Sequence, residues 1–96
     1  MFEVRTPRKG LKDILTMLGD KYQIKVIDLE NVIYRDYGDY DVEVSGLDNN
    51  RKNMNAFVYV WSKKPSKIVE KYPEIKSYGN LKELLDILEK RFLFPR

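Results

Sequence analysis

The side chains able to do chemistry in this chain are carboxylates, lysines, tyrosines and serines, because its 96 residues include neither cysteine nor histidine. Without histidine the usual general base, the commonest nitrogen ligand for metals and the serine–histidine relay are all missing. Without cysteine, thiolate nucleophiles, disulfides and cysteine-bearing zinc sites are excluded. No recognisable catalytic motif is present, so we expect a protein that is not an enzyme and needs no cofactor.

One group of carboxylates has a spacing that could serve a metal ion. Asp39, Asp41 and Glu43 alternate along the chain, and side chains two residues apart in a strand point to the same face of a sheet. Three carboxylates on one face could hold Mg²⁺, which prefers oxygen ligands. The same spacing is typical of a solvated strand face, and no glycine-rich phosphate loop accompanies it. A carboxylate-dependent metal enzyme is therefore a less favoured alternative.

A second group is aromatic and basic. Phe57, Tyr59 and Trp61 share one face of an expected strand, while Val58 and Val60 share the other. If the aromatic face is open, it is typical of sheets that stack single-stranded nucleic acid beside cations. If helices cover it, the aromatics are core residues, as large aromatic side chains usually are. The flanking basic residues are Arg51, Lys52, Lys63, Lys64 and Lys67.

Two further groups favour contact with another protein. Tyr34, Tyr37 and Tyr40 surround an expected turn and alternate with charged residues, a composition found at protein interfaces. The plainer interpretation is that they are strand residues beside a turn. The apolar end of the chain, with Phe92 and Phe94, must pack on the core or meet a partner, and a second copy is the economical partner because homodimers are the commonest oligomers.

Two helices are expected to help position these groups. The first runs from Pro7 to Leu18, with Thr6 as its N-cap and Gly19 as its C-terminal stop. Asn80 is expected to cap the second, with Glu83 closing a capping box. The apolar residues at helical spacing are Leu11, Ile14, Leu15 and Leu18 in the first helix and Leu81, Leu84, Leu85, Leu88 and Phe92 in the second.

Between the helices the hydrophobic period changes to two, as in strands. One strand is expected from Tyr22 to Ile33, bulged or broken near Asn31. A second covers residues 40–45 after a turn at 37–39, and a third runs from Met54 to Trp61 after the polar loop 46–53. The segment Ser66 to Tyr72 fits either a short helix or a strand, and we favour a helical turn ended by Pro73.

These elements predict one α+β domain over residues 1–96, a two-layer sandwich. An antiparallel sheet of three or four strands carries the N-terminal and C-terminal helices on one face. The net charge of +3 comes from interleaved basic and acidic residues, so no single-sign block marks a nucleic-acid tail. With no cysteine and no membrane-length apolar run, the cytoplasm is the expected compartment.

The function that we expect is non-catalytic binding of a macromolecule by a small accessory protein. A protein partner is favoured first and single-stranded nucleic acid second. The frequent lysine, asparagine, isoleucine and tyrosine suggest an AT-rich coding sequence, as in some bacteria and their mobile elements.

Overall fold

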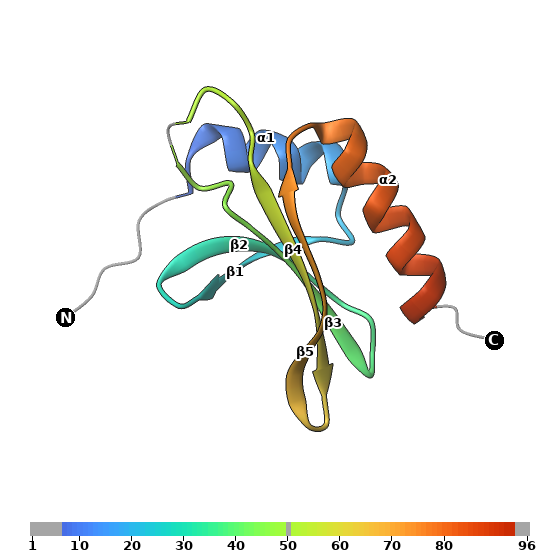
Figure 1. Ribbon diagram of the computed structural model, residues 1–96. Coiled ribbons are helices and arrows are strands. Elements are labelled where there is room, and N and C mark those ends of the chain that lie inside the picture. The colour runs from blue at the N-terminus through green and yellow to red at the C-terminus, as the bar shows by residue number, and fades with distance from the viewer. Residues whose placement is uncertain (1–6, 50, 94–96) are drawn as a thin grey trace.

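The computed structural model describes residues 7–49 and 51–93 (Figure 1). The elements in chain order are α1 (Lys9–Leu18), β1 (Gln23–Ile27), β2 (Glu30–Asp36), β3 (Tyr40–Ser45), β4 (Ala56–Lys63), β5 (Ser66–Ile75), α2 (Tyr78–Leu88) and the π-helical segment η1 (Glu89–Leu93). The strands form one sheet in the order β1-β2-β3-β4-β5, and each neighbouring pair is antiparallel. The predicted α+β class is confirmed, whereas the sheet has five strands instead of three or four.

The additional strand comes from a hairpin that the sequence did not reveal. The expected strand from Tyr22 to Ile33 is two strands, joined by a tight turn at Asp28 and Leu29. Both turn residues have positive φ, 52° and 66°, as a two-residue hairpin turn of this kind requires. Asn31, where a bulge or break was expected, instead pairs with Val26 inside the hairpin. The prediction of one strand was therefore wrong.

The segment after β4 is also a strand. Ser66 to Ile75 pairs with β4 along its length, with two register shifts, so the favoured helical turn over Ser66 to Tyr72 was wrong. Pro73 is tolerated because β5 is an edge strand, where a missing N–H group need not break a ladder. The pairing energy of the strongly apolar β4 decides the conformation of this locally ambiguous segment.

Both helices form as expected but begin elsewhere. The N-cap of α1 is Arg8, and its backbone N–H donates to Asp48 Oδ1 at 2.9 Å; the predicted cap Thr6 lies outside the described residues. Helix α2 is capped by Ser77, whose Oγ accepts from the backbone N–H of Asn80 at 3.1 Å. Asn80 is therefore the third residue of the helix, not its cap.

The core lies between the helices and one face of the sheet. Val42, Val44, Val58 and Val60 are fully buried on that face, with Leu11 of α1 and Leu81, Leu85 and Leu88 of α2 in the same cluster. Figure 1 shows α2 lying along the sheet while α1 crosses its end near the start of β4. None of the described helices is long and apolar enough to cross a membrane.

Candidate functional site

Strand β4 places a row of aromatic side chains on the face of the sheet that the helices leave uncovered. Along β4 the exposure alternates, with Val58 and Val60 at 0% and Phe57, Tyr59 and Trp61 half-buried. Of the two alternatives that the sequence left open, the aromatic residues thus do not form the core under the helices. We call the surface that carries them the open face.

The neighbouring strands surround the aromatic row with charged and apolar side chains. On β3, Asp41 pairs with Trp61 and Glu43 pairs with Tyr59. On β5, Ile68 pairs with Trp61 and Lys71 with Tyr59. Because paired residues in an antiparallel sheet point to the same face, these residues also belong to the open face. The register of β1 and β2 adds Lys25, Glu30, Val32, Tyr34 and Asp36.

The open face is hollowed at its Trp61 end. A cavity of about 300 Å³ lies there, and we call it the Trp61 pocket. Six of the residues that line it are Lys25, Tyr34, Asp41, Glu43, Trp61 and Lys63. Its walls thus combine two aromatic rings with charges of both signs, a combination that suits binding of a polar group with an apolar stem.

Glu43 forms part of the floor of this pocket. Its side chain is largely buried, since the residue is 7% exposed, and its Oε1 accepts a hydrogen bond of 3.0 Å from Trp61 Nε1. Burial raises the pKa of the Glu43 carboxyl, the Trp61 hydrogen bond opposes this, and the carboxylates of Glu30 and Asp28 raise it further. The hydrogen bond therefore fixes the orientation of the Trp61 indole, and the Glu43 carboxylate that accepts it is little solvated by water.

Asp41 lies beside Glu43 on the same strand face. Lys63 Nζ is 2.7 Å from Asp36 Oδ1 and 3.5 Å from Asp41 Oδ1. Burial, followed by the neighbouring carboxylate of Asp41, raises the pKa of Tyr34 well above its usual range. Asp41 Oδ1 itself is buried and accepts no hydrogen bond from the described residues. One carboxylate oxygen on the pocket floor is thus left incompletely paired.

Lys25 also lines the Trp61 pocket. Its Nζ lies 4.2 Å from the centroid of the Tyr34 ring, which is a cation–π contact. The side chain is exposed, so little burial fixes it in place. Lys25 was not among the candidates from the sequence, because only the β1–β2 pairing places it next to Tyr34.

The three carboxylates proposed for a metal ion are not gathered into one site. Asp41 and Glu43 share the open face, but Asp39 lies in the turn before β3. Among residues 7–49 and 51–93, no three carboxylate side chains stand close enough together to hold an ion. The geometry gives the metal-enzyme alternative no support.

The basic candidates divide into two groups at opposite ends of β4 (Figure 1). Arg51 and Lys52 lie in the loop before the strand, and Lys63, Lys64 and Lys67 lie around the hairpin that follows it. All five are exposed. Lys63 is already paired with carboxylates, so the remaining four are those whose charge faces water.

The tyrosines proposed as an interface do not form one patch. Tyr34 is 8% exposed on the open face, whereas Tyr37 is 4% exposed and belongs to the core on the helix side. Tyr40 packs on Phe92, with ring centroids 4.8 Å apart. Phe92 and Leu93 also contact the core, so this end of η1 packs on its own protein. Phe94 lies outside the described residues.

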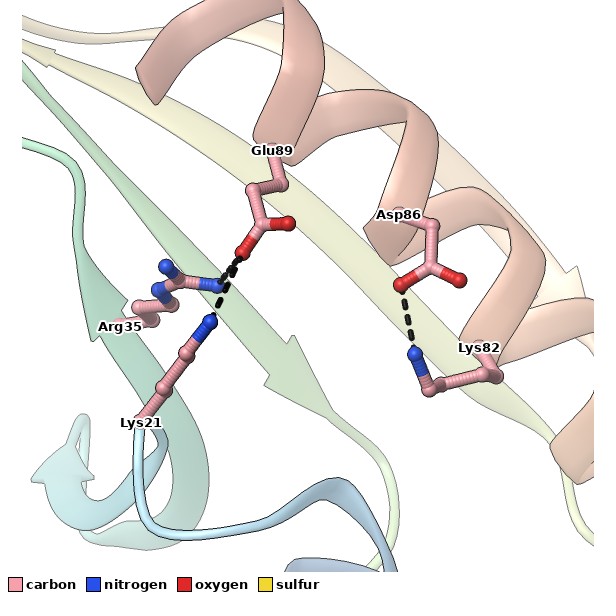
Figure 2. Close-up of polar contacts among 5 residues, drawn as sticks. All are labelled: Lys21, Arg35, Lys82, Asp86 and Glu89. Carbon is pink, nitrogen blue, oxygen red and sulfur yellow. Dashed lines mark hydrogen bonds and ion pairs between the residues drawn. The ribbon is translucent and has the colours of Figure 1, made fainter. Parts of the chain in front are cut away.

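A second polar group lies on the helix side of the sheet. The side chain of Arg35 donates to Glu89 Oε2, and Lys21 Nζ lies 3.9 Å from the same oxygen. Figure 2 shows Lys21 and Arg35 pointing toward Glu89, while Lys82 and Asp86 form a separate pair along α2. This contact could not be predicted from the sequence, because Arg35 and Glu89 are far apart in the chain.

Comparison with known proteins assigns neither a family nor a function to this chain. No family model, curated protein or solved structure matches the chain.

Proposed function

We propose that this chain is a non-catalytic accessory protein that binds a protein partner on the open face of its sheet. The observation that carries the proposal is the half-buried row of Phe57, Tyr59 and Trp61 on the face that no described helix covers. Large aromatic side chains that stay accessible on a rigid sheet are the residues that most often dominate the binding energy of protein interfaces.

The surroundings of the aromatic row fit an interface. Ile68, the partner of Trp61 on β5, is 44% exposed. An accessible apolar area bounded by charged residues is typical of a surface that contacts another protein. Because the backbone of β4 is already paired on both sides, the side chains of this face, not its backbone, would carry recognition.

The charges of the open face favour a protein over nucleic acid. Its carboxylates are Glu30, Asp36, Asp41 and Glu43, and its lysines are Lys25, Lys63 and Lys71. Carboxylates beside the aromatic row would repel the phosphates of a strand stacked on it. A protein segment avoids this repulsion and can present positive charge of its own.

Affinity capture with matched variants tests the proposal. Wild-type protein, Tyr59→Ala and the control Tyr78→Ala on α2 are used as baits in extracts treated with nuclease, and each captured protein is then purified and titrated. We expect one protein whose affinity falls at least tenfold with Tyr59→Ala, since central aromatic contacts are worth about 2 kcal/mol or more, and is unchanged with Tyr78→Ala. Circular dichroism checks that both variants are folded. If no captured protein distinguishes Tyr59→Ala from the control, the proposal is wrong.

Single-stranded nucleic acid is the second candidate, favoured by one observation. Exposed Arg51 and Lys52 precede β4 in the chain, and exposed Lys64 and Lys67 follow it, so they flank the two ends of the aromatic row. A strand stacked along β4 could therefore place phosphates near cations at both ends. This candidate requires the nucleic acid to bind despite repulsion between its phosphates and the carboxylates of the open face.

Oligonucleotide titrations separate the two candidates. Stacking should quench the fluorescence of Trp61, the only tryptophan of the chain, and Tyr59→Ala should weaken binding by about 1–3 kcal/mol without changing the salt slope. Lys64→Gln or Lys67→Gln should instead lower the salt slope by about 1. No quenching by oligonucleotides at low salt would leave the protein partner as the surviving candidate.

A further inference from the structure

We propose that the Trp61 pocket is a subsite for a single basic side chain, an arginine or a lysine, of the protein that occupies the open face. The inference rests on the proposed function and narrows it, because it names the chemistry that the partner must present at one position. The residues that would hold the incoming cation are Asp41, Glu43, Trp61 and Tyr34.

The first argument is an incompletely paired carboxylate oxygen in the pocket, whose lining carries two carboxylates and two lysines. Two carboxylates, Asp41 and Glu43, lie side by side on β3, and one of them is 7% exposed. Asp41 Oδ1 accepts no hydrogen bond from the described residues, and the Lys63 ammonium 3.5 Å away is shared with Asp36. A buried acceptor without a donor costs free energy, and an N–H group from a partner would recover it.

The second argument is that lysines of the same chain already make two kinds of cation contact in the pocket. One is a cation–π contact with an aromatic ring, and the other is an ion pair with a carboxylate. Lys25 Nζ lies over the ring of Tyr34, and Lys63 Nζ lies between the carboxylates of Asp36 and Asp41. These ammonium groups stand in for the side chain of a partner. Lys25 is exposed, so its displacement returns it to water at little cost, and a better-placed cation can replace it.

The third argument is size and shape. Binding sites for drug-sized ligands occupy about 300–1,000 Å³, and the pocket, at about 300 Å³, is at the lower end. One long side chain with a charged end fits that volume better than a larger molecule does. The ring of Trp61, fixed by its bond to Glu43, and the ring of Tyr34 offer flat apolar walls to the methylene stem and the planar guanidinium.

A small charged probe tests the pocket without the partner. N-acetyl-arginine amide is titrated against the protein while Trp61 fluorescence and backbone amide NMR shifts are recorded. Its neutral isostere N-acetyl-citrulline amide is the control. We expect saturable changes confined to the pocket with the arginine compound and at least tenfold weaker binding of the citrulline compound, because only the former brings a charge to the carboxylates.

Substitutions test which residues of the pocket bind the arginine probe. Asp41→Asn should weaken binding of the arginine probe at least tenfold, whereas Asp13→Asn, the same change on the exposed face of α1, should leave it unchanged. Lys25→Gln should tighten binding severalfold, because it removes the internal competitor for the Tyr34 ring. A role for Asp41 in folding alone would not produce this opposite response to Lys25→Gln.

Equal binding of the arginine and citrulline probes would overturn the inference, and so would an Asp41→Asn variant that binds the arginine probe as wild type does. These failures differ from a failure of the proposed function. A partner that depends on Tyr59 while the arginine probe leaves the Trp61 pocket unperturbed would refute the subsite alone. If no partner depends on Tyr59, the proposed function itself fails.

Discussion

Arg35 of β2 and Glu89 at the start of η1 are joined by a hydrogen bond of 2.5 Å between Nη1 and Oε2, although 54 residues separate them in the chain. The guanidinium is nearly buried and lies 5.4 Å from the ring centroid of Tyr22 and 5.3 Å from that of Tyr37. Burial opposes the charge of Arg35, but the bonds to Glu89 and Tyr22 raise its pKa above the usual value. The pair therefore fixes the end of α2 against the sheet.

Replacing Glu89 with Gln should destabilise the protein. The variant leaves Arg35 nearly buried without an anion, which costs about 1–3 kcal/mol of unfolding free energy. The matched control is Asp86→Asn, which removes an exposed ion pair with Lys82 on the same helix and should change stability by no more than about 0.5 kcal/mol. Urea denaturation measures both, and equal effects would show that the Arg35–Glu89 contact stabilises the fold no more than the exposed Lys82–Asp86 pair does.

The turn at Leu29 predicts a substitution that stabilises the fold. Leu29 has φ of 66° and is 68% exposed, so it occupies a left-handed conformation without burying its side chain. That conformation costs a residue with a Cβ about 1–2 kcal/mol. We expect Leu29→Gly to be about 1 kcal/mol more stable than Leu29→Ala, which keeps the strain. Thermal melts of the two variants measure this, and an Ala variant as stable as the Gly variant would contradict it.

Gly46 should not tolerate a side chain. Its φ is 83°, and an added Cβ would lie 2.8 Å from the backbone oxygen of Asn55. Gly46→Ala is therefore expected to cost about 1–3 kcal/mol. Gly79→Ala is the control, because a Cβ in that helical position meets nothing within 4 Å and should stabilise by up to about 1 kcal/mol. Denaturant unfolding should show opposite signs for the two changes.

Glu43 should make the stability of the protein depend on pH in an identifiable direction. Burial raises its pKa above 4.5 in the folded protein, so the folded state favours protonation of this carboxyl more than the unfolded state does. This contribution is complete below the unfolded pKa and is lost as the pH rises through the folded pKa. Glu43→Gln, which can still accept from Trp61, should therefore gain in melting temperature over wild type between pH 4 and pH 8. A constant difference across that range would contradict the assignment to Glu43.

The elements with strong local signals were predictable from the sequence, and those decided by distant partners were not. The leucine stripe of α2 and the alternation of β4 identify a helix and a strand without further information. The turn at Asp28 and Leu29 lacks the glycine or asparagine that usually reports a two-residue hairpin. Ser66 to Tyr72 becomes a strand only because β4 offers it a partner.

The candidate site was partly predictable for a similar reason. Alternation placed Phe57, Tyr59 and Trp61 on one face, but both faces of β4 are apolar, so only the path of the helices decides which one stays open. The sequence already indicated that Tyr34 and Tyr37 lie on different faces, because they are three residues apart and side chains in extended chain alternate between faces. The contribution of Lys25 depends on the β1–β2 register, which could not be predicted from the sequence.

The irregular edge of the sheet at β5 also limits how this protein can associate. A strand added from another chain needs an unbroken row of N–H and C=O groups along the edge. Strand β5 interrupts that row with Pro73 and with register shifts opposite residues 56–58 and 60–61 of β4. Such interruptions oppose edge-to-edge aggregation. Exposed apolar residues such as Ile68 and Val69 can therefore remain on this strand without making it a template for fibril-like stacking of identical chains.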